Sequence, residues 1–296
     1  MRKTVISAGL LCVAGLAGSS AIAQEMQGPP KVLEIQREYG KFGKGPAHQR
    51  NETAYVQAVM AAKSPVRYFA AVSTSGTNEA WFFVGHDSFD AYQKSSDEQE
   101  KNTALRAQLD RVMDRDADFI SNGTTILATY DEKKSYHPNI DIAAMRYMEV
   151  ETIRVRLGHD KEWEELVSLV NSTLDKAKMD VHAVFYDVAY GAPANTVLIF
   201  TPHKSLGEVD AAFASFDKQF MDALGSDGQK KLADLEGAAI LSDQTELFAF
   251  DPKMSYPPDE WVKADAFWKA TPAAKTAAAP AAASAKKPAA SPTSKQ

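Results

Sequence analysis

The sequence predicts an α+β fold in which one β-α-β-β-α-β unit occurs twice along the chain. Two observations lead to this prediction. Short segments of the first part of the chain recur in the second part in the same order, and both parts show the same succession of strand-like and helix-like patterns. We therefore divide the chain into a leader at residues 1–23, two repeats at residues 24–140 and 141–261, and a tail at residues 262–296.

Three pairs of matching segments indicate this internal repeat. The last pair shares the pattern D-x-K-x-S-Y-x-P, and the offset between partners drifts slowly along the chain, as small loop insertions in a duplicated domain would cause. The pairs begin at Leu33 and Met148 with an offset of 115, at Phe83 and Phe200 with an offset of 117, and at Asp131 and Asp251 with an offset of 120.

The first strand and first helix of each repeat follow from hydrophobic periodicity. Val32–Tyr39 and Tyr147–Val155 alternate between apolar and polar residues, which is typical of half-buried strands. Pro46–Ala62 follows a glycine-rich turn and reads as a helix. In its partner, Asp160–Lys178, apolar residues recur at helical spacing. These residues are Trp163, Leu166, Val167, Val170 and Leu174.

The second and third strands of each repeat are predicted to form a hairpin, because a turn containing Gly and Asn joins them. A helical stretch begins at Ser88 or Ser205, a further helix follows, and a fourth strand closes the repeat. The predicted hairpins are Val66–Ser73 with Ala80–Val84 and His182–Ala189 with Val197–Thr201, the further helices are Glu98–Phe119 and Asp227–Leu241, and the closing strands are Thr125–Tyr130 and Thr245–Phe250.

Each repeat therefore makes an antiparallel sheet with helices on one face, and two copies can cover each other's bare face. This order, with a turn such as Leu157–Asp160 before the first helix, resembles the dimeric α/β barrel superfamily over about Lys31 to Pro258. That group includes antibiotic-biosynthesis-type monooxygenases, NIPSNAP-like proteins and haem-degrading enzymes. The resemblance implies two tandem ferredoxin-like repeats packed sheet to sheet as a pseudo-dimeric barrel. The Asn, Trp and His of the haem-degrading members have no residue-by-residue match here, so the chemistry stays open.

The polar faces of the two first strands are the candidate ligand site. In the first repeat Glu34, Gln36 and Glu38 share one face, and Leu33 and Ile35 share the other. We expect the apolar face to meet the helices and the acidic face to point into the barrel, where enclosed carboxylates acquire raised pKa values. Alternatively, these residues line a wet rim or pair with nearby arginines. The candidate ligand-binding residues are Glu34, Gln36, Glu149, Glu151 and His182, and no catalytic residue is assigned.

No metal site is predicted, since neither HExxH nor a tight His/Asp cluster occurs. His86 and His203 occupy equivalent positions, but each stands just before a helix, where a polar residue is ordinary. Tyr136 and Tyr256 of the D-x-K-x-S-Y-x-P segments are expected to pack against the body as structural residues. No cofactor is expected from the residues, and haem is the alternative that the family resemblance adds.

The first 23 residues read as a signal peptide, with Arg2 and Lys3, an apolar stretch, and cleavage near Ala23. We expect a periplasmic or secreted protein with no transmembrane segment. Cleavage removes Cys12, the only cysteine, and with it any disulfide or thiol chemistry. The Ala/Pro/Lys-rich tail at residues 262–296 is predicted to be disordered.

The net charge of the chain limits the kinds of partner that it can bind. The net charge is −6, and the tail holds lysines without acids, so the body is more acidic still and unsuited to nucleic acid. We expect an exported soluble protein that binds a small ligand between its two sheets, as a monomeric pseudo-dimer or a homo-oligomer. The alternative is an enzyme of the monooxygenase or haem-degrading type. A filled apolar interior would count against a site between the sheets.

Overall fold

The protein forms a closed barrel of eight antiparallel strands in the order β1-β3-β2-β8-β5-β7-β6-β4. The structure, a computed structural model, describes residues 28–269, apart from the side chains of residues 215–217; the predicted leader and residues 270–296 of the predicted tail lie outside the described residues. The strands are β1 Val32–Gly40, β2 Phe69–Ser73, β3 Glu79–His86, β4 Ile120–Tyr136, β5 Tyr147–Val155, β6 Ala183–Tyr190, β7 Thr196–His203 and β8 Ile240–Phe250.

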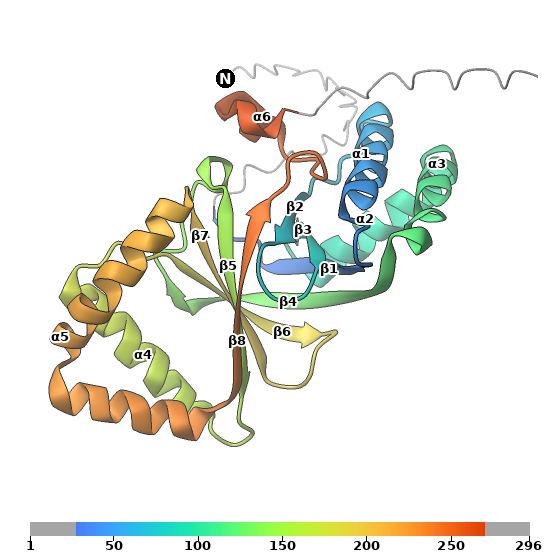
Figure 1. The fold of residues 1–296 in the computed structure, drawn as a ribbon. Helices are drawn as coiled ribbons and strands as arrows, with labels where there is room; N and C mark the ends of the chain where they lie inside the picture. Colours follow the sequence, from blue (N-terminus) through green and yellow to red (C-terminus); the bar gives the residue numbers. More distant parts are fainter. Residues whose placement is uncertain (1–27, 270–296) are drawn as a thin grey trace, which may run out of the picture.

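The helices lie outside the barrel, with α1–α3 on one side and α4 and α5 on the other (Figure 1). Along the chain the order is β1-α1-β2-β3-α2-α3-β4 and then β5-α4-β6-β7-α5-β8, so the predicted α+β class and barrel are confirmed. In the described part of the chain no helix is both long and apolar enough to cross a membrane. The helices are α1 Gly45–Ala61, α2 Phe89–Lys101, α3 Thr103–Met113, α4 Asp160–Ala177, α5 Leu206–Ala239 and α6 Asp259–Ala264, with short 3-10 turns η1 Asp116–Asp118, η2 Ile142–Ala144 and η3 Ala266–Trp268.

The two sides differ in the helices that follow the third strand. On the first side the predicted helix at Glu98–Phe119 is divided, and Asn102 caps the start of α3 by accepting a hydrogen bond from Leu105 N at 3.1 Å. On the second side α5 runs over 34 residues and is broken only at Gly225, whose φ of 71° suits a residue without a Cβ.

The repeated D-x-K-x-S-Y-x-P segments join the two halves of the chain. Ser255 Oγ accepts a hydrogen bond from Ala70 N of β2 at 2.9 Å, and Ser135 Oγ accepts one from Phe185 N of β6 at 2.9 Å. Each serine therefore reaches across to a strand of the other half, next to the β2–β8 and β4–β6 seams. Tyr136 and Tyr256 are buried, in agreement with the structural role predicted for them.

The barrel interior is filled with apolar side chains, so the predicted orientation of the first strands is wrong. Leu33 and Ile35 of β1 point inward with residues from all eight strands, and the acidic residues of β1 and β5 face the helices. Phe83 and Phe200, from opposite halves, meet in the interior at a ring separation of 5.9 Å. The alternation of apolar and polar residues correctly identified the two faces of these strands. Because the closed interior of the barrel excludes water, the apolar face points inward.

The C-terminal segment closes one end of this interior. Trp268 is 1% exposed, packs on Phe250 and donates its indole N–H to Ala143 O at 2.8 Å. The predicted disordered tail therefore begins too early, because residues 262–269 form the end of α6 and the η3 turn. The Ala/Pro/Lys-rich composition of the whole tail does not reveal Phe267 and Trp268 at its start, which pack on each other while Trp268 also packs on Trp261 and on Phe250 of the barrel.

Candidate functional site

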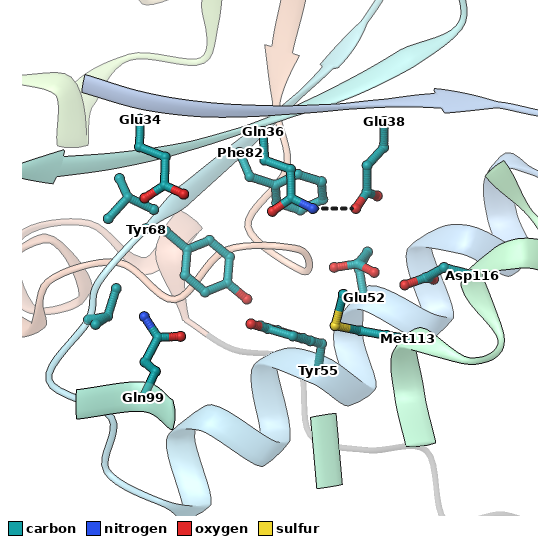
Figure 2. Close-up of a pocket in the computed structure, with 12 residues that line it drawn as sticks. Glu34, Gln36, Glu38, Glu52, Tyr55, Tyr68, Phe82, Gln99, Met113 and Asp116 are labelled. Carbon is teal, nitrogen blue, oxygen red and sulfur yellow. Dashed lines mark hydrogen bonds between the residues drawn. The ribbon is translucent and has the colours of Figure 1, made fainter. Parts of the chain in front are cut away.

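A polar cavity of about 130 Å³ lies outside the barrel, between the outer face of β1 and β3 and the helices α1–α3. Figure 2 shows Glu34, Gln36 and Glu38 entering it from β1, opposite Glu52 and Tyr55 of α1. The alternation that points Leu33 and Ile35 into the barrel directs these three polar residues outward. The cavity is lined by Glu34, Gln36, Glu38, Glu52, Tyr55, Val66, Tyr68, Phe82, Val84, Gln99, Met113 and Asp116.

Glu38, His48 and Glu52 form a buried cluster at one end of the cavity. His48 and Glu52 lie one helical turn apart on α1, which places both on the face that meets β1. His48 Nε2–H donates to Glu38 Oε2 at 2.7 Å, and the same nitrogen lies 3.9 Å from Glu52 Oε1. The three residues are 5–7% exposed. One ligand atom from each lies within 4.8 Å of the others, the spacing of groups that could share a cation.

Asp116 adds a further carboxylate to this end of the cavity. It is held by Asn51, whose Nδ2 donates to Asp116 Oδ1 at 2.5 Å. Burial first, and then the negative charges of Glu38 and Asp116, raise the pKa of Glu52 well above its usual value. The pKa of Asp116 is also raised, mainly by burial. Among the described residues, no Lys or Arg forms an ion pair with Glu38, Glu52 or Asp116, and His48 is the basic side chain that contacts this group.

Two tyrosines complete the polar lining. Tyr68 is 9% exposed, and its hydroxyl has no hydrogen-bond partner among the described residues. Figure 2 shows this hydroxyl pointing into the cavity, towards the Tyr55 side chain. Burial and the nearby carboxylates, led by Glu52, raise the pKa of Tyr55 to about 12, so its phenol stays protonated. Both hydroxyls can therefore accept or donate a hydrogen bond to a group placed between them.

The structure separates the five residues that the sequence suggested. Glu34 and Gln36 line the cavity, and Glu34 Oε2 lies 3.1 Å from His86 Nε2. Glu149 and Glu151 lie on the outer face of β5, beneath α4 and α5 on the other side of the barrel. His182 lies apart from both groups and contacts the carbonyl oxygen of His137 at 2.7 Å. Whether any of the five binds a ligand remains a prediction.

Glu149 and Glu151 have partners of their own on the second side. His203 Nε2 lies 3.2 Å from Glu149 Oε1, at the place that corresponds to the His86–Glu34 contact, but without the hydrogen bond that His86 makes. Burial first, and then Asp243, raises the pKa of Glu151 to about 7. The arginine alternative does not apply to the first strand, because Arg37 pairs with Glu79 at 2.9 Å on the inward face of the sheet.

Sequence reasoning missed His48, Glu52, Tyr68 and Asp116. His48 and Glu52 could have been found by comparing each position of the first half with the position 115 residues later. At that offset, three polar residues of the first half are replaced by buried apolar residues in the second, where they belong to the core beneath α4 and α5. The pairs are Glu38 with Ile153, His48 with Trp163, and Glu52 with Val167.

Haem does not fit this cavity. A volume of about 130 Å³ lies below the roughly 300 Å³ at which pockets for larger organic ligands begin. Carboxylates line the cavity and would repel the propionates of haem. His48 is engaged with Glu38, and His86 with Glu34, rather than presented to open space. We therefore derive no step that uses haem.

No protein-family model and no curated protein matches the chain. Solved structures that are similar include a candidate monooxygenase from Fusobacterium nucleatum, with 14% identity, a TM-score of 0.46, and coverage of 74% of this chain and 91% of that one. An anthrone oxidase-like protein is 9% identical, with a TM-score of 0.45 and coverage of 75% and 92%. A mutant chlorite dismutase from Candidatus Nitrospira defluvii is 9% identical, with a TM-score of 0.44 and coverage of 76% and 92%. Similarity at this level transfers no activity or cofactor to this chain.

Proposed function

We propose that this chain is an exported binding protein that holds a small cationic ligand in the acidic cavity between β1 and α1. The supporting observation is the group of buried carboxylates, Glu38, Glu52 and Asp116, which has no Lys or Arg partner among the described residues. Burial and mutual repulsion disfavour the charged form of these carboxyl groups, which raises the pKa of Glu52 and of Asp116, and a bound cation would favour the charged form. The ligand site that we propose therefore lies outside the barrel, and not between the sheets as expected from the sequence.

The second half of the chain supports this assignment by contrast. The same framework positions carry Ile153, Trp163 and Val167, which pack into an apolar core. The fold therefore does not need polar residues there, and positions that break a packing rule without structural need are expected at functional sites. The enzyme alternative would rest on fold resemblance alone, and a fold does not define a function.

The proposal predicts selective stabilisation by cations. Purified protein would be heated with ammonium, methylamine, 1,4-diaminobutane, Ca²⁺, Mn²⁺ or Zn²⁺, each as the chloride. At a concentration about 100 times its Kd, a specific ligand contributes about 2.7 kcal/mol to stability, which corresponds to a rise in Tm of roughly 5–10 °C for a domain of this size.

The matched variants are E38Q/E52Q, inside the cavity, and E149Q, on the opposite side of the barrel. The rise should vanish in E38Q/E52Q and persist in E149Q. The proposal fails if no cation raises Tm, or if the rise is equal in all three proteins.

A further inference from the structure

We infer that Glu38, His48 and Glu52 bind a first-row divalent transition-metal ion of the Zn²⁺ or Mn²⁺ type. This inference rests on the proposed function and names the ligand class for the same cavity. Two independent observations point to a ligand here. One is the cluster of one imidazole and two carboxylates, whose ligand atoms lie within 4.8 Å of one another. The other is the buried Tyr68 hydroxyl, which points into the cavity and has no partner among the described residues.

The kind of ligand atom selects the kind of ion. Imidazole nitrogen suits Zn²⁺, Fe²⁺, Ni²⁺ and Cu²⁺, whereas carboxylate oxygen suits Mn²⁺ and the harder ions. Ca²⁺ and Mg²⁺ prefer oxygen ligands alone, so His48 disfavours both. A set of one nitrogen and two oxygens is therefore best matched by a transition metal that accepts mixed ligands.

Of the two distances from His48 Nε2 to the carboxylate oxygens, one is shorter and one is longer than a bound ion requires. Zinc bonds to nitrogen and oxygen are about 2.0–2.2 Å long, so neighbouring ligand atoms of a tetrahedral site lie roughly 3.3 Å apart. His48 Nε2 is 2.7 Å from Glu38 Oε2 and 3.9 Å from Glu52 Oε1. Shifts of roughly half an ångström, within reach of side-chain rotation, would equalise the two distances from His48, and the ligand atoms of Glu38 and Glu52 start within 4.8 Å of each other. The ion takes the place of the proton on His48 Nε2, so the bound imidazole is the neutral form with its one proton on Nδ1. Glu52 binds as the carboxylate, and the protons that the ligands give up leave to solvent.

The ligands are held by rigid elements and by neighbouring side chains. Glu38 projects from a barrel strand, and His48 and Glu52 project from one helix packed on that strand. Gln36 Nε2 donates to Glu38 Oε1 at 3.3 Å, which leaves Oε2 directed at His48. Such outer partners orient the ligand atoms of metal sites. Asp116, fixed by Asn51, supplies a further acceptor close by.

The remaining cavity, with Tyr55, Tyr68 and Gln99, would adjoin the ion. Protein ligands number three, and three protein ligands plus an open position is the pattern of metal sites that take water or a small molecule. We therefore expect water, or a small molecule with an oxygen or nitrogen donor, to complete the coordination and to bond to the Tyr68 hydroxyl.

The test is direct metal binding to purified protein without a polyhistidine tag. Protein is stripped with chelator and titrated with Zn²⁺, Mn²⁺ and Ca²⁺ by calorimetry, and with Co²⁺ by visible absorption, which reports nitrogen and oxygen ligands through its d–d bands. We expect one Zn²⁺ or Mn²⁺ per chain, much weaker Ca²⁺ binding, and a cobalt spectrum that differs from aqueous Co²⁺.

Two variants report on the ligands, one on an outer partner, and one controls for surface sites. E52Q and H48Q should weaken Zn²⁺ or Mn²⁺ binding by more than the roughly 10–100-fold that loss of an outer partner causes, and Q36A should fall within that range. E164Q, which changes an exposed carboxylate of α4, should bind like the original protein. Circular dichroism and thermal unfolding confirm that each variant folds, and E52Q removes charge at nearly constant shape if H48Q does not fold.

The outcomes separate this inference from the proposed function. Binding of an amine without transition-metal binding overturns the metal inference and leaves the cationic-ligand proposal intact. Absence of binding by every cation overturns both. Metal binding that E52Q and H48Q leave unchanged also overturns the inference, because it would place the ion elsewhere on the chain.

Discussion

The two sides of the barrel use the same framework for different purposes. Beneath α4, Trp163 and Val167 join Ile153 of β5 in an apolar core. Beneath α1, the residues at the same offset are His48, Glu52 and Glu38, which are equally buried but polar. The comparison teaches that α4 anchors its side of the barrel through packing, whereas α1 positions a charged group at a cost in stability.

Features that both sides share are structural by the same reasoning. The His86–Glu34 and His203–Glu149 contacts, at 3.1 and 3.2 Å, occupy matching places in the two halves. A contact kept in both halves serves the common framework, so the histidine–glutamate pairs are weaker candidates for a specific site than the cluster around His48.

The largest effect is expected where the second side relies on packing. Replacing Trp163 by Ala removes a side chain that is 5% exposed and leaves a cavity beneath α4. The free energy of unfolding should fall by about 3–5 kcal/mol. Urea unfolding followed by circular dichroism would measure it. A loss below about 1 kcal/mol would mean that this core is not the anchor of its side.

The next effect concerns Glu151, whose carboxyl is buried beneath α4 and α5. Its pKa is raised from 4.5 to about 7, so the folded state favours the protonated form. Stability from this group is therefore present below about pH 4.5 and is lost as pH rises through about 7. E151Q, which mimics the protonated form, should gain up to about 3 kcal/mol at about pH 8 and close to nothing at about pH 4.5. Unfolding curves at the two pH values test this, and an equal gain at both would contradict it.

The serine contacts across the seams offer a matched pair of smaller effects. Ser255 is 1% exposed, so S255A leaves the buried Ala70 N–H without its acceptor and should cost about 1–3 kcal/mol. Ser135 is only half-buried, and S135A should cost about 1 kcal/mol or less, because solvent can partly replace the lost hydroxyl. Denaturant midpoints of the two variants compare the seams. Equal losses would mean that burial does not distinguish them.

The smallest effect, opposite in sign, is expected at the proposed site. E52Q replaces a buried carboxyl whose pKa is raised well above its usual value by burial and by the charges of Glu38 and Asp116. In chelator-treated protein at about pH 8 it should raise the free energy of unfolding by about 1 kcal/mol, because ionising this buried carboxyl is costly and the amide does not ionise. Thermal unfolding measures the gain. If E52Q is destabilising instead, Glu52 has a structural role and the contrast between the two sides weakens.

Much of the fold could be predicted from periodicity and from the repeated segments. The order of strands and helices follows from local pattern, and the offset between the halves placed Pro46–Ala62 against Asp160–Lys178 correctly as helices. Which face of β1 points inward could not be decided in this way. Alternation at Leu33 and Ile35 is the same for either orientation, and the choice depends on strands that are distant in the sequence.

The site was predictable only in part for the same reason. Glu34 and Gln36 were identified from the strand pattern, but His48 and Glu52 come from the helix that follows this strand, and Asp116 comes from a turn far along the chain. These residues are candidates for a site because they are buried, and the sequence of a helix does not show whether a polar residue on it is buried. Comparing the two halves position by position supplies the missing information, because Trp163 and Val167 mark those helix positions as buried.

The strand order also has a consequence for biosynthesis. In the sheet, β2 is flanked by β3 and β8, and β4 is flanked by β1 and β6, so both strands have a partner that is made late. As the chain emerges, the first half exposes two unpaired strand edges until β6 and then β8 arrive, and such edges are prone to aggregation. Trp268, which closes the interior, emerges after all eight strands. We expect a nascent chain that stalls between the halves to depend on chaperones far more than the finished protein does.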